Sequence, residues 1–188
     1  MMTWLRHNAK EAIAALALVV LFATYIAIHP RGFSTYVVTI WSNQGALLGL
    51  AAIAQFFVVL VKGIDLSVGS IIALTNVVAS YLLHGSPTSI ALGMVVVLAV
   101  GTACGLANGI AVVYGRVQPI VVTLATGGIF GGIALILRPT PGGSIDPDLS
   151  DALTYAVGGN PVSAIILVVV LAILWVLLRR TAIGPALY

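Results

Sequence analysis

Long stretches without a single charged residue are the feature that most limits what this chain can fold into. Five of them run over residues 12–30, 32–61, 66–115, 117–137 and 152–178. A membrane-spanning helix needs about 20 largely apolar residues, because it crosses a hydrocarbon layer of about 30 Å at about 1.5 Å per residue. Charged residues make up only 7% of the chain, against about 25% in soluble domains. We therefore expect an integral membrane protein.

The third charge-free stretch is too long for one helix. It is interrupted by His84-Gly85-Ser86-Pro87, a cluster typical of a turn. The sequence thus predicts an all-α, polytopic membrane domain over residues 1–188 with about six transmembrane helices. The predicted spans lie near residues 12–29, 40–61, 66–84, 89–113, 118–137 and 161–178.

The basic residues predict the orientation of these spans, since cytoplasmic loops carry an excess of Lys and Arg. With both termini in the cytoplasm, six of the eight basic residues lie inside and two outside. The inside set is Arg6, Lys10, Lys62, Arg116, Arg179 and Arg180, and the outside set is Arg31 and Arg138. Scattered in this way, the basic residues form no patch for nucleic acid.

Glycines recur at four-residue spacing, which places them on one face of a helix. In membranes such small residues let helices approach closely, so we predict helix packing at Gly101, Gly105, Gly109, Gly127 and Gly131. The alternative is that some of these glycines line a substrate path, where the backbone must come close to a ligand.

Asp65 lies at the start of the third span, within Lys62-Gly63-Ile64-Asp65-Leu66-Ser67-Val68-Gly69-Ser70. A carboxylate there can accept hydrogen bonds from unpaired N–H groups at a helix N-terminus. Alternatively, the flanking glycines permit an irregular backbone at membrane depth, which is tolerated only when it is buried in protein or lines a cavity. The second interpretation makes Gly63, Asp65, Ser67 and Gly69 part of a gate or a broken helix start.

A sparse set of uncharged polar residues falls within the spans. Such side chains in a membrane either bond across helices or contact a polar solute. Hydrogen bonding between helices is the simpler interpretation of any one of them, but as a set they permit a path for a neutral, hydroxylated solute. The set is Asn43, Gln44, Gln55, Thr75, Asn76, Asn108, Thr123 and Thr126.

The sequence lacks the residue patterns that ATP binding, catalysis at membrane depth and metal binding require. It has no Gly-rich phosphate loop for ATP, no nucleophile with a base or paired acids at membrane depth, and no metal-ligand spacing among His7, His29, His84 and Cys104. We therefore expect no catalytic residue, no metal and no cofactor in this chain, and a source of energy elsewhere. A channel stays open as an alternative, although no charged residue lies in the middle of a span.

Three stretches together resemble the membrane permeases of ATP-binding-cassette importers of the ribose and monosaccharide type. They are 63–75 (GIDLSVGSIIALT), 105–109 (GLANG) and 119–126 (PIVVTLAT), the last leading to Gly132-Ile133-Ala134-Leu135. The C-terminal stretch 178–188 also resembles the part that follows the sixth hydrophobic segment in that family. Members of the family continue into a cytoplasmic docking segment and further helices, so the resemblance implies the N-terminal portion of a permease.

The resemblance implies a multi-pass subunit in the bacterial inner membrane that moves a neutral, monosaccharide-like solute. Its implied partners are a second permease subunit, two ATP-binding subunits that hydrolyse ATP, and a solute-binding protein. Asn76, Asn108, Thr123 and Thr126 are then the candidates for the substrate path. The alternatives are a truncated remnant that transports nothing and a channel-like membrane protein.

Overall fold

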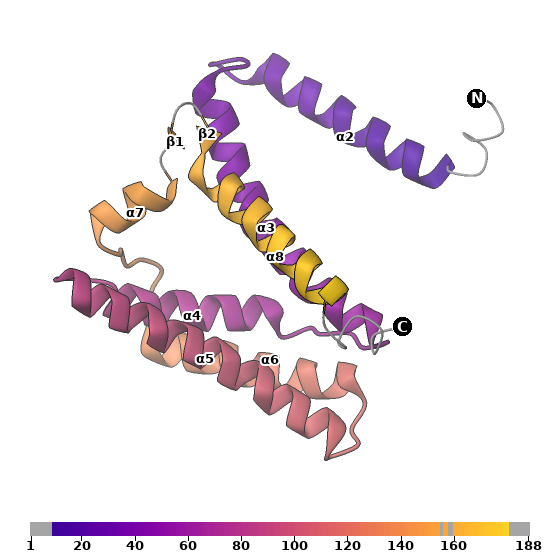
Figure 1. Cartoon of the computed structure of the whole chain (residues 1–188), viewed down its shortest axis with the longest axis vertical. Helices are drawn as coiled ribbons and strands as arrows, with labels where there is room; N and C mark the ends of the chain where they lie inside the picture. Colours follow the sequence, from indigo (N-terminus) through magenta and orange to yellow (C-terminus); the bar gives the residue numbers. More distant parts are fainter. Residues whose placement is uncertain (1–8, 155, 158–159, 181–188) are drawn as a thin grey trace.

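The computed structural model describes residues 9–154, 156–157 and 160–180, and these form helices joined by short loops (Figure 1). The all-α prediction is confirmed, with one short exception: β1 (Ala156–Val157) pairs antiparallel with β2 (Asn160–Pro161). The helices are α2 (Ala9–Ile28), α3 (Thr35–Leu60), α4 (Val68–Leu82), α5 (Pro87–Val113), α6 (Pro119–Leu137), α7 (Pro147–Thr154) and α8 (Val162–Arg180).

Each predicted span corresponds to one of these helices. Three of the described helices, α3, α5 and α6, are long and apolar enough to cross a membrane, and α2, α4 and α8 contain shorter apolar segments. The count of six crossings thus stays a prediction. Helix α3 begins five residues before the predicted start, and α7 was not predicted, because its eight residues include two aspartates and only a short apolar face.

Local sequence explains where several helices begin. The Ser34 hydroxyl accepts a hydrogen bond from Val37 N (3.4 Å), and the Ser86 hydroxyl accepts one from Ser89 N (3.2 Å). Pro87 and Pro119 occupy the first turns of α5 and α6, where the missing N–H of proline leaves no bond unmade. The starts of α5 and α6 therefore lie within two residues of the predicted boundaries, whereas the Ser34 cap starts α3 earlier than predicted.

The helices form two packed groups. In one group α4, α5 and α6 pack on each other around a core of Leu74, Cys104, Phe130 and Ala134; in the other α3 packs along α8. Figure 1 shows α3 and α8 lying side by side, apart from the three-helix group. The chain joins the two groups twice, through the link between α3 and α4 and through the segment that runs from α6 by way of α7 to α8.

Helix α2 joins the rest of the molecule through aromatic side chains at its C-terminal end. The ring of Phe22 lies 4.9 Å from that of Trp41, and the ring of Tyr25 also lies 4.9 Å from Trp41, measured between centroids. Beyond this contact α2 extends away from α3 (Figure 1). Most of the surface of α2 therefore has no contact with the rest of the described chain.

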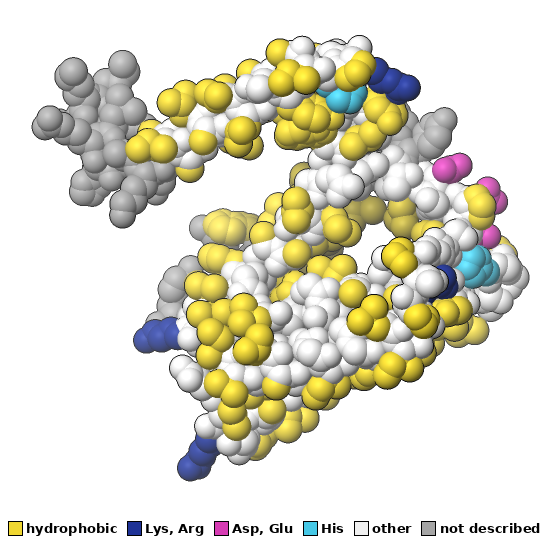
Figure 2. All heavy atoms as spheres, turned by 180° about the vertical axis from the view of Figure 1, so that it is seen from behind, with side chains coloured by type: hydrophobic (Ala, Val, Ile, Leu, Met, Phe, Trp, Pro, Cys, Tyr) yellow, Lys and Arg dark blue, Asp and Glu magenta, His cyan; other side chains and the backbone are white. Residues whose placement is uncertain are grey.

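Much of the apolar surface is exposed. The chain has 13231 Å² of accessible surface for 19.4 kDa, whereas a compact soluble monomer of that mass exposes about 8,500 Å². Leu98 is 71% exposed and Leu135 65%, and hydrophobic side chains cover much of the face shown in Figure 2. Lipid, or further protein, must cover these side chains.

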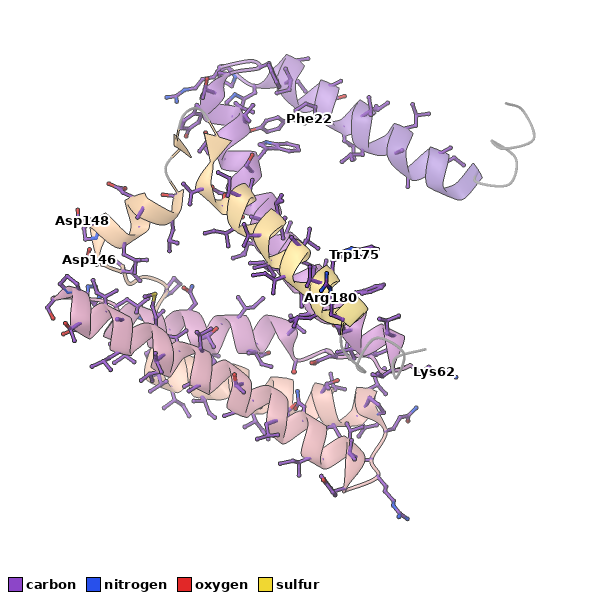
Figure 3. All side chains as sticks on the ribbon, viewed as in Figure 1. Phe22, Lys62, Asp146, Asp148, Trp175 and Arg180 are labelled. Atoms are coloured by element: carbon purple, nitrogen blue, oxygen red, sulfur yellow. The ribbon has the colours of Figure 1, made fainter. Side chains whose placement is uncertain are left out.

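Charged side chains gather at opposite ends of the helices. Lys62 and Arg180 lie at one end, and Asp146 and Asp148 lie at the other (Figure 3). We call these the basic end and the acidic end. Helix α4 starts next to Lys62 and finishes near Asp146, whose N–H donates to Leu83 O (2.8 Å). The predicted orientation makes the basic end cytoplasmic.

Candidate functional site

The link between α3 and α4, residues 63–67, is an irregular segment next to a short helix. Helix α4 has only 15 residues, which at about 1.5 Å per residue gives about 22 Å, less than the hydrocarbon thickness. If α4 spans the membrane, part of the link must lie at membrane depth. Its backbone N–H and C=O groups then need partners within the protein.

Thr123, on α6, supplies partners for two of these backbone groups. Its hydroxyl accepts a hydrogen bond from Leu66 N (3.0 Å) and donates one to Ile64 O (3.2 Å). The side chain is 4% exposed. A single hydroxyl thus bonds one backbone N–H and one backbone C=O of the link, and it holds the link against the first turns of α6.

Asp65 and Asn108 hold the end of the link from two other sides. Asp65 Oδ1 accepts hydrogen bonds from Ser67 N (2.7 Å) and Ser67 Oγ (2.6 Å). Asn108, on α5, donates from Nδ2 to Ser67 Oγ (2.8 Å). Ser67 is fully buried and Asn108 is 6% exposed. Asp65 therefore forms an Asx turn with the residue before α4, rather than capping the first turn of the helix itself.

We call Asp65, Ser67, Asn108 and Thr123 the polar node. It contains one further acceptor: Asn108 Oδ1 is buried and has no hydrogen-bond partner. A buried amide oxygen without a partner is costly, so the node lacks one hydrogen bond in this conformation. The node joins the link to both α5 and α6.

Two glycines allow the link to lie this close to its neighbours. A Cβ atom at Gly127 would lie 3.4 Å from Ser67 Cα, and one at Gly63 would lie 3.1 Å from Val58 Cγ1. Larger side chains at either position would push the link away from α6 or α3. Gly131 and Gly101 lie nearly as close, a Cβ being 3.6 Å from Ser70 Oγ and 3.5 Å from Thr75 Cγ2 respectively.

Other glycines from the sequence analysis lie on open surface. A Cβ at Gly69, Gly105 or Gly109 would meet nothing within 4 Å. Any packing partner of Gly105 and Gly109 therefore lies outside the described part of this chain. Sequence spacing also missed the tightest helix crossing that involves a glycine: a Cβ at buried Gly93 would lie 2.8 Å from Leu82 O.

The other two predicted path residues are not members of the polar node, although the Thr126 hydroxyl also lies 3.5 Å from Thr123 O. Thr126 donates its hydroxyl hydrogen to Val122 O (3.0 Å) in its own helix. Asn76 is exposed in the middle of α4 and borders a cavity at the acidic end. The structure thus brings together Asp65, Ser67, Asn108 and Thr123, and it leaves Asn76 at a separate place.

The cavity beside Asn76 has a volume of about 390 Å³. Its walls come from α4, the loop after α6 and the start of α7, and its lining residues are Asn76, Val77, Ser80, Gly142, Gly143, Ser144, Ile145, Pro147 and Ser150. The sequence analysis singled out only Asn76 among them. Of the others, Val77 and Ser80 lie on α4, Pro147 and Ser150 lie on α7, and residues 142–145 lie in a glycine- and serine-containing loop of ordinary turn composition, so no sequence signal marked them.

A second cavity, of about 350 Å³, lies between α3 and α4 toward the basic end. Leu47, Leu50, Ala51, Ala54, Val68, Ile71 and Ile72 line it, with Asp65 at its border. On α4, Val68, Ile72, Asn76 and Ser80 recur at the spacing of one helix face. One side of α4 and its preceding link thus borders both cavities.

The described residues hold no group of three or more His, Cys, Asp or Glu side chains that could bind a metal ion. The chemistry that these sites offer consists of neutral hydrogen-bond donors and acceptors, with one carboxylate. Together with the apolar helices, this arrangement defines the class of the protein: a polytopic membrane protein whose irregular link before α4 is held by uncharged polar side chains and one carboxylate.

The comparisons with known proteins identify the family. The family model described as "Branched-chain amino acid transport system / permease component" matches residues 37–188, and the chain belongs to this family of permease components. It is 36% identical over 183 residues to the ribose import permease protein RbsC of Haemophilus influenzae, covering 95% of this chain and 56% of that protein. This confirms the resemblance stated from the sequence motifs.

The chain is also 31% identical over 187 residues to the autoinducer 2 import system permease protein LsrD of Escherichia coli O157:H7, covering 96% of this chain and 56% of that protein. The chain thus spans a little over half the length of these curated relatives. No solved structure shows a significant match.

Proposed function

We propose that this chain is a permease subunit of an ATP-binding-cassette importer in the bacterial inner membrane, and that it moves a neutral, monosaccharide-like solute. The observation that carries the proposal is the interrupted helix start at residues 63–67 in a member of a permease family. Discontinuous helices at membrane depth are typical of transport sites, because freed backbone groups there can face a solute or a cavity.

The two packed groups suggest how the subunit would change access. Helices α3 and α8 form one group and α4 to α6 the other, with few contacts between them. Rocking of one group against the other would be absorbed in part by the link, which begins at Gly63 and leads into Gly69 in the first turn of α4. The hydrogen bonds of the polar node then hold the link on the three-helix group in the conformation described, and they would break in the alternative conformation.

In this proposal Asn108 and Thr123 stabilise the link in the conformation described, because both side chains are buried and form hydrogen bonds to it. They would face the path only if the node opens. The proposed partners are a second permease subunit, two ATP-binding subunits at the basic end and a solute-binding protein at the acidic end. ATP would bind to the partner subunits.

The neutral solute follows from the polar groups that border the two cavities. Asn76, Ser80, Ser144 and Ser150 offer amides and hydroxyls, and the only charged side chain among the lining residues of either cavity is Asp65. Hydroxyl groups of a sugar both donate and accept hydrogen bonds, as these side chains do. The names of the relatives, a ribose and an autoinducer 2 import permease, agree with a solute of this kind.

Uptake into proteoliposomes tests the proposal. The subunit is reconstituted with candidate ATP-binding subunits and a candidate solute-binding protein of the same organism, and entry of labelled D-ribose is followed with and without ATP. We expect uptake only with ATP. Uptake without ATP would favour the channel alternative, and no uptake of any neutral sugar would favour the non-transporting remnant.

Asn108→Ala gives a test at the level of the site. We expect lower uptake with unchanged insertion into the membrane, because the link loses its hydrogen bond to α5. Thr102→Ala is the matched control, since Thr102 also lies on α5 but its hydroxyl donates only to Leu98 O (2.8 Å). Normal uptake by Asn108→Ala would reduce Asn108 to a packing role.

A further inference from the structure

We infer that the cavity at the acidic end of α4 is a binding site for a neutral, polyhydroxylated solute, the first that such a solute meets in this subunit. The inference rests on the proposed function, because it supplies a place for the solute which that function requires. It extends beyond the residues that the sequence marked, to Ser80, Gly143, Ser144 and Ser150.

The position of Asn76 is the first observation. Asn76 lies near the middle of the 15-residue helix α4, its side chain is exposed, and its amide makes no hydrogen bond to any described residue. An exposed amide offers two N–H donors and one carbonyl acceptor. Since Asn76 opens into the cavity, water or a solute must satisfy it there.

The size and chemistry of the lining are the second observation. A volume of about 390 Å³ lies within the range of roughly 300–1,000 Å³ typical of small-molecule sites. Besides the Asn76 amide, three serine side chains and the backbone of two glycines border it, together with Val77, Ile145 and Pro147. None of the lining residues is charged, and the nearby Arg138 guanidinium lies over the Tyr81 ring.

The rigidity of the wall is the third observation. The loop is tied to α4 by the hydrogen bond from Asp146 N to Leu83 O, and the Asp146 carboxylate accepts bonds from Asp148 N (3.1 Å) and Leu149 N (3.3 Å) at the start of α7. These bonds hold the loop and α7 in place before any solute arrives.

Gly143 and Arg138 complete the wall. Gly143 has a φ of +99°, and a Cβ there would lie 2.9 Å from Arg138 Cζ and 3.0 Å from Ser80 Cβ, so only glycine fits. The Arg138 guanidinium lies over the Tyr81 ring, 4.5 Å from its centroid, and Tyr81 donates to Leu137 O (2.8 Å). The positive charge is thus directed to an aromatic ring behind the lining.

The site is tested by protection of an introduced cysteine. Ser80→Cys is made in the full chain, reconstituted in lipid nanodiscs and labelled with a membrane-impermeant maleimide. The only native cysteine, Cys104, is 7% exposed, so the unsubstituted chain gives the background. Ser89→Cys is the matched control, because Ser89 lies on the first turn of α5, outside the cavity lining.

We expect D-ribose to slow labelling of Ser80→Cys by the factor 1 + [L]/Kd, about threefold when its concentration is twice Kd. D-ribose 5-phosphate should not slow it, and neither sugar should affect Ser89→Cys. Adding Asn76→Leu should abolish the protection, whereas Gln44→Leu, which removes an exposed amide on α3 outside the cavity, should not. Equal labelling with and without D-ribose and other neutral sugars overturns the site.

Uptake by the unsubstituted importer separates this inference from the proposed function. ATP-driven uptake without protection of Ser80→Cys would refute the site and leave the transport function standing. Protection without uptake would support the site and refute the transport function. Protection by D-ribose 5-phosphate as strong as that by D-ribose would overturn the assignment of a neutral solute.

Discussion

Thr123→Val tests whether one hydroxyl holds the link between α3 and α4. Valine has nearly the shape of threonine but cannot bond to Leu66 N or Ile64 O, which lie 3.0 and 3.2 Å from the hydroxyl oxygen. A buried backbone group left without a partner costs about 1–3 kcal/mol. Because the link is only part-buried, we take the lower value for each group and expect a loss of about 2 kcal/mol.

The single native cysteine provides the assay. Cys104 lies in the core of the three-helix group with Leu74 and Phe130, so a thiol-reactive fluorogenic dye reacts with it only when that group opens. For a chain of 150–250 residues, about 1 kcal/mol shifts the melting temperature by about 2–4 °C. Thr123→Val should therefore lower the melting temperature in detergent by about 4–8 °C.

Two variants control for the other effects of this substitution. Thr126→Val removes a hydroxyl that bonds only within α6 and should leave the melting temperature nearly unchanged. Thr123→Ser keeps the hydroxyl and removes only a methyl group, so it should melt above Thr123→Val. The explanation is refuted if Thr123→Val melts like Thr126→Val, or if Thr123→Ser melts as low as Thr123→Val.

Three further predictions concern packing, the Asx turn and topology. Gly93→Ala should destabilise the three-helix group by about 1–3 kcal/mol, as overpacking does, because its Cβ would lie 2.8 Å from Leu82 O. Gly105→Ala is the control, because nothing lies within 4 Å of a Cβ there, and it should not lower the melting temperature reported by Cys104. Equal melting temperatures of the two variants would contradict the close crossing at Gly93. Asp65→Asn keeps the acceptor for Ser67 and should have nearly the melting temperature of the unsubstituted chain, whereas Asp65→Leu should melt lower in the same assay. If Asp65→Asn is as unstable as Asp65→Leu, the charge of Asp65 stabilises the protein and the Asx turn does not. Pro147→Cys should react with an impermeant thiol reagent added outside intact cells, and labelling only after lysis would overturn the predicted orientation.

The membrane fold could be predicted because the hydrocarbon layer imposes a length. Charge-free stretches of about 20 residues or more are rare for any other reason, and each predicted span falls on a helix of the structure. Helix α7 escaped this reasoning, since it lies outside the apolar stretches and is only eight residues long. The shortness of α4 was also hidden, because an extended apolar segment and an apolar helix have the same composition.

The candidate site could be predicted only as separate residues. Asp65, Ser67, Asn108 and Thr123 each drew attention as polar groups in apolar surroundings, and the glycines near Asp65 indicated an irregular backbone. Their pairing depends on how α4, α5 and α6 pack, and sequence spacing within one helix carries no information about that. Spacing also treated Gly101, Gly105 and Gly109 alike, although only Gly101 has a close neighbour in the described chain.

The sequence by itself determined that this protein lies in a membrane, roughly where its long apolar helices fall and that its polar residues within the spans are mostly uncharged, because these follow from local composition and the cost of charge in lipid. Only the tertiary structure decided that Thr123 and Asn108 hold the link before α4, and that Asn76 opens instead into a cavity walled by the loop after α6. The reason is that hydrogen bonds and cavity walls join residues distant in the chain, so their geometry is set by packing between helices.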